Sequence, residues 1–261
     1  MTTPEGKLRL GGMALRNGLL VHGPTCWAAA VRTDGGEIKA ASGRKPRLRA
    51  ADAVPGVRGV ARLAEAMAVI PLVKRGLPEV KLPFQDVSVL TVAAGASLTG
   101  ALARKRVRGF GGESIAAIAS VTPALFALRG GELAEYHGVE HKAIAAYEQD
   151  KEDAGDAAKE HDRCGSHLVA PLLASNLAGT LILRSALDKP GPVAGGAVAL
   201  ASTAVAVEVF AWCERNAETK LAQALRRPGF EIQRLIGTRE PDERQLEVGR
   251  AALAEILRAE A

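Results

Sequence analysis

The segment His137-Gly-Val-Glu140-His141 combines residue types that bind metals with a carboxylate that can move a proton. On a helix, histidines four positions apart lie on one face, about one turn apart. H-x-x-E-H is the inverted zincin arrangement, in which both imidazoles hold a metal and the glutamate acts as a base toward water. We therefore expect His137 and His141 to bind a divalent metal, zinc by this chemistry, with Glu140 as the catalytic base. The alternative is a solvated helix face that carries these residues by chance.

A metal site needs further ligands, and residues 161–167 (His-Asp-Arg-Cys-Gly-Ser-His) offer them. A Cys164 thiolate or the His161 imidazole would suit zinc, and Arg163 could favour the thiolate by its charge. The acidic loop before this segment is long enough to fold it back over the preceding helix. Alternatively, Cys164 and Gly165 simply form a tight turn that enters the third apolar helix.

Two further acids are candidates for supporting roles. Glu148 lies seven residues past His141, roughly 10 Å along an unbroken helix at the usual rise per residue, which is too far to share one ion. It can bind the ion only if the helix breaks, and otherwise supports the ligands or belongs to a separate site. Glu208 is the lone acid near the end of the fourth apolar stretch, where a carboxylate is costly unless paired. If that helix surfaces before Trp212, Glu208 is simply interfacial. The remaining residues of these reactive types are expected to be structural: His22, Cys26 and Cys213.

Four apolar stretches without a charged residue dominate the centre of the chain. Of the 261 residues 48% are hydrophobic, yet only 3% are aromatic, which favours closely packed helices over an aromatic-rich β core. The stretches run 15 to 18 residues, whereas a membrane-spanning helix needs about 20. Their small residues suit tight helix pairing in lipid, and the alternative is a soluble bundle of buried, alanine-rich helices. The stretches are Val87–Ala103, Ser114–Leu128, Leu168–Leu183 and Pro190–Val207.

The rest of the chain is polar or amphipathic. Cys26–Arg32 and Glu37–Ala41 flank Asp34-Gly35-Gly36, a turn that predicts a β-hairpin. Apolar residues at helical spacing from Pro55 to Val73 predict an amphipathic helix, and Pro241 with its neighbouring acids predicts a helix start. The predicted units are 1–50, a small β unit; 51–129, the amphipathic helix and first apolar pair; 130–166, a polar insert with the His/Glu/Cys motif; 167–215, the second apolar pair; and 216–261, an amphipathic tail. The predicted fold class is mainly α: a multipass helical membrane protein with a small N-terminal β unit and a polar insert that holds the metal site.

The formal net charge of +5 comes with two basic runs, Arg44–Arg49 and Arg104–Arg108. A nucleic-acid partner is not expected, because there are few aromatics to stack on bases and no recognisable binding module. Basic residues that flank apolar segments are typical of the anionic cytoplasmic membrane face, so membrane lipid is the expected partner. With four spans the N-terminus, insert and tail share one side. The basic load before Lys81 predicts that this side is cytoplasmic, although Arg104–Arg108 then faces the other way. Three scattered cysteines indicate a reducing compartment.

Three blocks, residues 135–148, 161–166 and 238–248, together with residues 11–24, resemble the YqhQ-like family, also called domain of unknown function 1385. This resemblance implies a bacterial multipass protein of the inner (cytoplasmic) membrane that belongs to a group of predicted metal-dependent enzymes without an established reaction. Asn17 and His22 depart from the family, which usually has an acidic and a basic residue there. The positions that match its motif are His137, Glu140, His141, Glu148, His161, Arg163 and Cys164, with Glu208 at a late acidic position.

Two functions follow from these features, with a weaker third. The first is a metal-dependent hydrolase, a peptidase among the options, that uses zinc and Glu140. The second is a non-catalytic membrane protein whose Cys and His residues hold a structural metal. A structural zinc site is closed by four protein ligands, whereas a catalytic one keeps an open position. The third is a soluble helical protein without a metal. The substrate and the oligomeric state are not predicted by the sequence.

Overall fold

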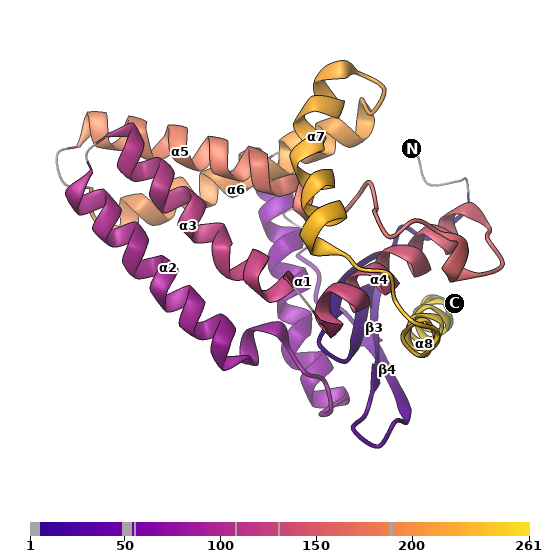
Figure 1. The fold of residues 1–261 in the computed structure, drawn as a ribbon. Helices are drawn as coiled ribbons and strands as arrows, with labels where there is room; N and C mark the ends of the chain where they lie inside the picture. The colour runs from indigo at the N-terminus through magenta and orange to yellow at the C-terminus, as the bar shows by residue number, and fades with distance from the viewer. Residues whose placement is uncertain (1–5, 49–53, 55, 108, 130, 188–189) are drawn as a thin grey trace.

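The computed structural model describes residues 6–48, 54, 56–107, 109–129, 131–187 and 190–261. Five predicted features touch positions outside these residues, namely Arg49 and Arg108 in the basic runs, Pro55 at the first helix, Gly130 at the polar insert, and the boundary at residues 50 and 51 between the first two predicted units. Within the described part of the chain the protein is mainly helical, with a small antiparallel sheet formed by its N-terminal residues (Figure 1). The predicted fold class is confirmed at this level.

The sheet is a meander in which each strand pairs with the next along the chain. Its third hairpin is the predicted one: β3 and β4 pair from Cys26 opposite Arg44 to Arg32 opposite Ile38. Gly36 closes the turn with a φ of +85°, a conformation that favours glycine. The strands are β1 (Gly11–Leu15), β2 (Gly18–His22), β3 (Cys26–Arg32) and β4 (Ile38–Arg44).

Helices cover both faces of this sheet, because successive side chains of a strand point to opposite sides. On one face Leu20, Trp27 and Val31 pack against α1 (Val57–Gly76) through Val69 and Val73. The other face packs against α4 (Glu132–Gln149) and α8 (Glu243–Glu260). The buried residues shared there include Leu19, Val21 and Ala28 of the sheet, Tyr136 and Val139 of α4, and Val248, Ala252 and Ile256 of α8.

The helix predicted in the C-terminal tail is α8, and it forms part of this core. Asp242 caps its first turn by accepting a hydrogen bond from the backbone N–H of Gln245, whose side chain binds back to Asp242. At the other end the Glu260 carboxylate accepts the backbone N–H groups of Thr25 and Cys26 at 2.7 Å. The end of α8 is therefore bound to the start of β3.

Four helices are long and apolar enough to cross a membrane. Each helix is longer than its charge-free stretch because it continues into flanking polar or basic residues. Long basic side chains can reach from apolar surroundings to water. Within them only 11–28% of the most apolar window is buried inside the protein. A soluble bundle would bury these faces, so their exposure favours lipid contact. The helices are α2 (Val87–Arg106), α3 (Phe110–Leu128), α5 (Val169–Ala186, preceded by η4, Gly165–Leu168) and α6 (Pro192–Arg215).

These helices form two hairpins whose turns lie at the end of the bundle away from the sheet (Figure 1). At that end the buried Glu113 forms ion pairs with Arg104 at 3.0 Å and Arg184 at 2.9 Å, which joins α3 to α2 and α5. After α6 the chain returns toward the sheet through α7 (Lys220–Ile232) and the π-helical turn η5 (Gln233–Gly237). Each hairpin therefore begins and ends on the side of the molecule that contains the sheet.

Candidate metal centre

Three of the predicted ligands converge on one point. Helix α4 carries His137 and His141 one turn apart, and Cys164 stands at the start of η4, where the chain turns into α5. One ligand atom from each of the three lies within 4.8 Å of the other two. Among the described residues this is the one group of three or more His, Cys, Asp or Glu side chains with such spacing. The triad of His137, His141 and Cys164 could hold a metal ion.

Backbone carbonyls hold the Nδ1 atoms of the two imidazoles, which leaves each Nε2 lone pair for another partner. His137 Nδ1 lies 2.7 Å from the carbonyl oxygen of Gly237, and His141 Nδ1 lies 2.6 Å from that of Lys159. Because a carbonyl oxygen only accepts hydrogen bonds, each Nδ1 must carry the proton, and each Nε2 keeps a lone pair. This is the arrangement that orients histidines bound to metals. Nε2 of His141 is buried without a hydrogen-bond partner among the described residues.

The surroundings keep His141 in the form that binds metals. Burial lowers the pKa of His141, and the nearby His137 lowers it further, against the opposing effect of the Cys164 thiol. The imidazole is therefore neutral at physiological pH. Cys164 Sγ lies 3.4 Å from His137 Nε2 and accepts the backbone N–H of Ser166 at 3.5 Å. Cys164 thus forms the turn into η4 and also belongs to the triad, so the two interpretations of this residue are compatible.

Glu140 shares a cavity with the triad. The cavity has a volume of about 550 Å³ and is lined by His137, Glu140, His141 and Cys164 on this side. Burial raises the pKa of Glu140, against the opposing effect of the nearby histidines. No described residue donates a hydrogen bond to its carboxylate. Gly12 of β1 makes room for this side chain, because a Cβ there would lie 2.6 Å from Glu140 Cγ.

His161, Arg163 and Glu148 form a second group beside the triad. The His161 ring lies 5.6 Å from that of His141, but its Nε2 faces Glu148 at 3.4 Å and its Nδ1 accepts the backbone N–H of Arg163. His161 is therefore not among the converging ligand atoms. Burial opposes ionisation of Glu148, but the hydrogen bond to His161 and the charge of Arg163 outweigh it and lower the pKa of Glu148. Arg163 also donates to the carbonyl of Leu10, at the edge of the sheet.

The residue that anchors the 161–167 segment is Gln233, which sequence patterns did not single out. Gln233 is fully buried in η5; its amide oxygen accepts the backbone N–H of His161 at 2.8 Å, and its amide nitrogen donates to Ser166 Oγ at 2.9 Å. A similar role falls to the buried Lys142, whose ammonium group donates to the carbonyls of Gly155 and Ala157. The one sequence signal for Gln233 or Lys142 is a polar side chain among apolar neighbours. This signal does not identify the hydrogen-bond partner.

Glu208 and the other reactive side chains lie outside the triad. Glu208 lines a separate apolar groove with Val205 and Trp212, and its carboxylate accepts the backbone N–H of Gly56 at 3.2 Å. Cys26 and Cys213 are buried free thiols. His22 lines the far wall of the cavity that contains the triad.

Gly138 allows the close approach that positions His137. A Cβ at Gly138 would lie 2.2 Å from the backbone oxygen of Arg239, just after the Gly237 carbonyl that holds the imidazole. We expect Gly138→Ala to lower the free energy of unfolding by about 1–3 kcal/mol, the usual cost of overpacking. It should also weaken metal binding by roughly tenfold or more, since it displaces a hydrogen-bond partner of a ligand.

Denaturant unfolding in detergent and metal titration measure these two effects. Gly95→Ala is the matched control, because a Cβ at Gly95 in α2 meets no atom within 4 Å. If Gly138→Ala keeps the stability and metal affinity of the wild type, the proposed role of the Arg239 segment is wrong.

Comparison with known families gives one match. Residues 132–259 match the family described as a protein of unknown function, DUF1385. This segment begins with α4 and includes the triad, Glu140, η5 and nearly all of α8. No curated protein and no solved structure matches the chain.

Proposed function

We propose that this chain, whose residues 132–259 belong to the family of unknown function DUF1385, is a metal-dependent hydrolase at a membrane surface. The observation that carries the proposal is the buried Nε2 of His141, which has a lone pair and no partner among the described residues. An orphaned buried nitrogen is costly unless something binds it. His137 and Cys164 each offer a ligand atom within 4.8 Å of the ligand atom of His141.

His137, His141 and Cys164 would hold the ion through two nitrogens and one sulfur. This donor set is typical of zinc, which binds imidazole and thiolate together. Three protein ligands beside a cavity of about 550 Å³ favour the open type of site that catalytic zinc uses. When bound, the ion would supply Lewis acidity to a substrate in the cavity. His141 and His137 would stay oriented by the carbonyls of Lys159 and Gly237.

Glu140 would act as the base of the reaction. Its carboxylate faces the same cavity, and burial raises its pKa toward the range in which a carboxylate can both accept and release a proton. Glu140 would take a proton from the attacking water and later give it to the leaving group. If Glu140 instead binds the ion, the site is closed by four protein ligands and the function is structural. Metal analysis of ligand variants and of Glu140→Gln decides between these functions.

We also propose that the sheet side of the protein lies in the cytoplasm. The described basic residues before Lys81 support this side by the positive-inside preference. Two arginines at the opposite end, Arg104 and Arg184, are partly neutralised by their ion pairs with Glu113, which reduces the charge that opposes this orientation.

This placement is tested in bacterial membranes. The protein should resist alkaline carbonate extraction and require detergent, because the exposed faces of its four apolar helices need lipid. All three native cysteines are buried, so new ones can be labelled selectively. With a membrane-impermeant maleimide, Asp150→Cys should react only after the inner membrane is permeabilised, whereas Lys105→Cys should react in intact spheroplasts. A stable soluble monomer would refute membrane insertion, and the reverse labelling pattern would refute the orientation.

A further inference from the structure

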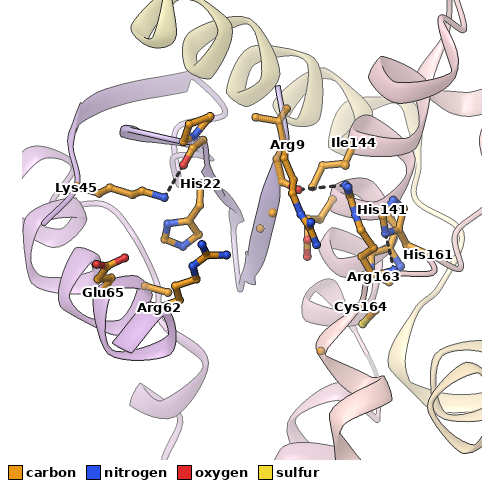
Figure 2. Close-up of a pocket in the computed structure, with 18 of the residues that line it drawn as sticks. Arg9, His22, Lys45, Arg62, Glu65, His141, Ile144, His161, Arg163 and Cys164 are labelled. Carbon is orange, nitrogen blue, oxygen red and sulfur yellow. Dashed lines mark hydrogen bonds between the residues drawn. The ribbon is translucent and has the colours of Figure 1, made fainter. Parts of the chain in front are cut away.

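The cavity beside the triad is bordered by an edge of the sheet. β1 is the first strand of the meander, so β2 pairs with one of its edges, and no strand among the described residues pairs with the other. Gly11 and Gly12, where β1 begins, line the same cavity as the triad. Figure 2 shows Arg9, just before this strand, between the wall with His22 and the wall with His141. An edge strand offers unpaired N–H and C=O groups, and here they border the proposed metal centre.

The alternation of an antiparallel strand determines which backbone groups point away from β2. Before β1, the Leu10 carbonyl accepts a hydrogen bond from Arg163 at 3.2 Å. After β1, the Arg16 N–H donates to the Lys81 carbonyl at 2.9 Å. Both bonds leave the sheet from even-numbered residues, so Gly12 also directs its N–H and carbonyl away from β2. No hydrogen bond from a described residue outside β1 and β2 reaches these two groups. The edge is therefore occupied at both ends and open at Gly12.

Two exposed glycines keep the space beside this edge free. Gly12 gives room to Glu140, as described above. A Cβ at Gly11, by contrast, would meet no atom within 4 Å, so packing among the described residues does not require a glycine there. Glycine weakens a strand interior, and it often marks a position where a ligand or another backbone approaches closely. The missing side chain at Gly11 leaves open space in the cavity on the face of the sheet opposite Glu140.

We propose that β1 binds an extended segment of a polypeptide substrate as an added strand, with a peptide bond of that segment placed at the triad. A polypeptide carries N–H and C=O groups at the repeat of a strand, so one substrate residue can exchange both hydrogen bonds with Gly12. An added strand lies about 4.8 Å from its neighbour. Since Glu140 packs against Gly12, such a strand passes close to the base.

This assignment of substrate class rests on the proposed hydrolase function and makes the reaction the hydrolysis of a peptide bond. The oxygen of water bonds to the carbonyl carbon, and the bond from that carbon to the amide nitrogen breaks. Glu140 takes a proton from the water and gives it to the departing amine nitrogen. The products are a carboxylate and an amine, and no further reactant is needed.

Peptide binding is measured by fluorescence anisotropy on the full-length protein in detergent, at 4 °C and directly after mixing. The probe is a pool of labelled hexapeptides of mixed sequence, with acetylated and amidated ends, because backbone hydrogen bonds give affinity regardless of sequence. The matched probe is the same pool methylated on every peptide nitrogen, which has no N–H donors. We expect the methylated pool to bind at least about tenfold more weakly, the loss of one or more hydrogen bonds. Equal binding of the two pools, or no binding of either, would overturn the proposal.

A variant of the edge tests the location. Gly11→Val fills the space beside β1 and should weaken binding of the unmethylated pool at least about tenfold. Valine favours strands, so this variant should unfold in denaturant no earlier than the wild type. Ala40→Val is the matched control, because Ala40 is exposed on β4, the other edge strand of the same sheet, and should bind the pool as the wild type does. Wild-type binding by a folded Gly11→Val would show that the peptide lies elsewhere.

The metal and the edge are separated by His141→Ala, which should lose the ion but still bind the pool. Binding that disappears with the ion would show that the peptide had bound the metal alone, and this overturns the added strand. If the wild type holds no metal yet binds the pool in a Gly11-dependent way, the hydrolase proposal fails and the edge site stands. If the wild type hydrolyses p-nitrophenyl acetate but does not bind the pool, the edge site fails and the hydrolase stands.

A second copy of this chain is the other occupant that an open edge can accept. Light scattering in detergent measures the mass of the wild type and of Gly11→Val. A monomer in both cases, with Gly11-dependent binding of the pool, supports a substrate strand. A wild-type dimer that Gly11→Val separates into monomers would assign the edge to the second copy and overturn the proposal.

Discussion

Purified wild-type protein is expected to carry about one zinc ion per chain, and His141→Ala is expected to lose it. The reason is geometric: one ligand atom each of His137, His141 and Cys164 lies within 4.8 Å of the other two. Because the site has three protein ligands, removing one of them should strongly lower the metal affinity. The loss should be larger than the roughly 10- to 100-fold loss that follows from removing a hydrogen-bond partner of a ligand. Elemental analysis after gel filtration in detergent, with zinc-buffered dialysis, measures the ion content.

Matched variants make the result specific. His137→Ala and Cys164→Ser should lose the ion as His141→Ala does. His22→Gln is the control, because His22 lines the opposite wall of the same cavity and is not part of the triad. His161→Gln should retain the ion with weaker affinity, since His161 contacts Glu148 rather than the converging ligand atoms. Full metal content in both His137→Ala and His141→Ala would show that these histidines are not the metal ligands.

The part of this site that follows from sequence is its local part. His137 and His141 are four residues apart, and a helix alone is enough to bring them together. The helical rise also predicted that Glu148 would lie too far along to share their ion, and it instead contacts His161 and Arg163. The β3–β4 hairpin was predictable for a similar reason, because its turn and its paired residues are neighbours in the chain.

The choice among the residues of the second segment was not predictable from sequence. His161 and Cys164 have equally suitable chemistry, but Cys164 joins the triad and His161 turns to Glu148. The path of this segment is set by the buried Gln233, which lies more than 60 residues later and binds both His161 and Ser166. No spacing rule reveals a hydrogen bond across that separation.

The basic side chains across the cavity from the triad were not predictable for the same reason. Lys45 lies in a basic run that sequence reasoning assigned to the membrane face, and Arg62 lies on a helix whose amphipathic pattern says only that one side is polar. Their position across from the triad depends on α4 and α1 packing on opposite faces of one sheet. Tertiary packing decides such a contact, so only the structure could show that these charges share a cavity with Glu140.

Glu140→Gln is expected to fold, keep its ion and lose hydrolytic activity by at least about 100-fold, the usual scale for loss of a general base. Glutamine preserves the shape of the side chain that packs against Gly12 but cannot accept the proton. Since burial raises the pKa of Glu140, its charged form opposes folding, and its contribution to stability falls as pH rises through the folded-state pKa. The metal-free variant at neutral pH should therefore unfold no earlier than the metal-free wild type.

The activity is measured with p-nitrophenyl phosphate, p-nitrophenyl acetate and a peptide mixture, and the ion by elemental analysis of the same samples. Glu132→Gln is the matched control, because Glu132 is exposed at the start of the same helix and should leave both quantities unchanged. Loss of the ion in Glu140→Gln would make Glu140 a ligand, and the metal would then be structural. A retained ion with unchanged hydrolysis would equally exclude Glu140 as the base. Glu140→Gln keeps the ion if Glu140 is a base and loses the ion if Glu140 is a ligand. The ion content therefore distinguishes these two roles, whichever substrate the cavity accepts.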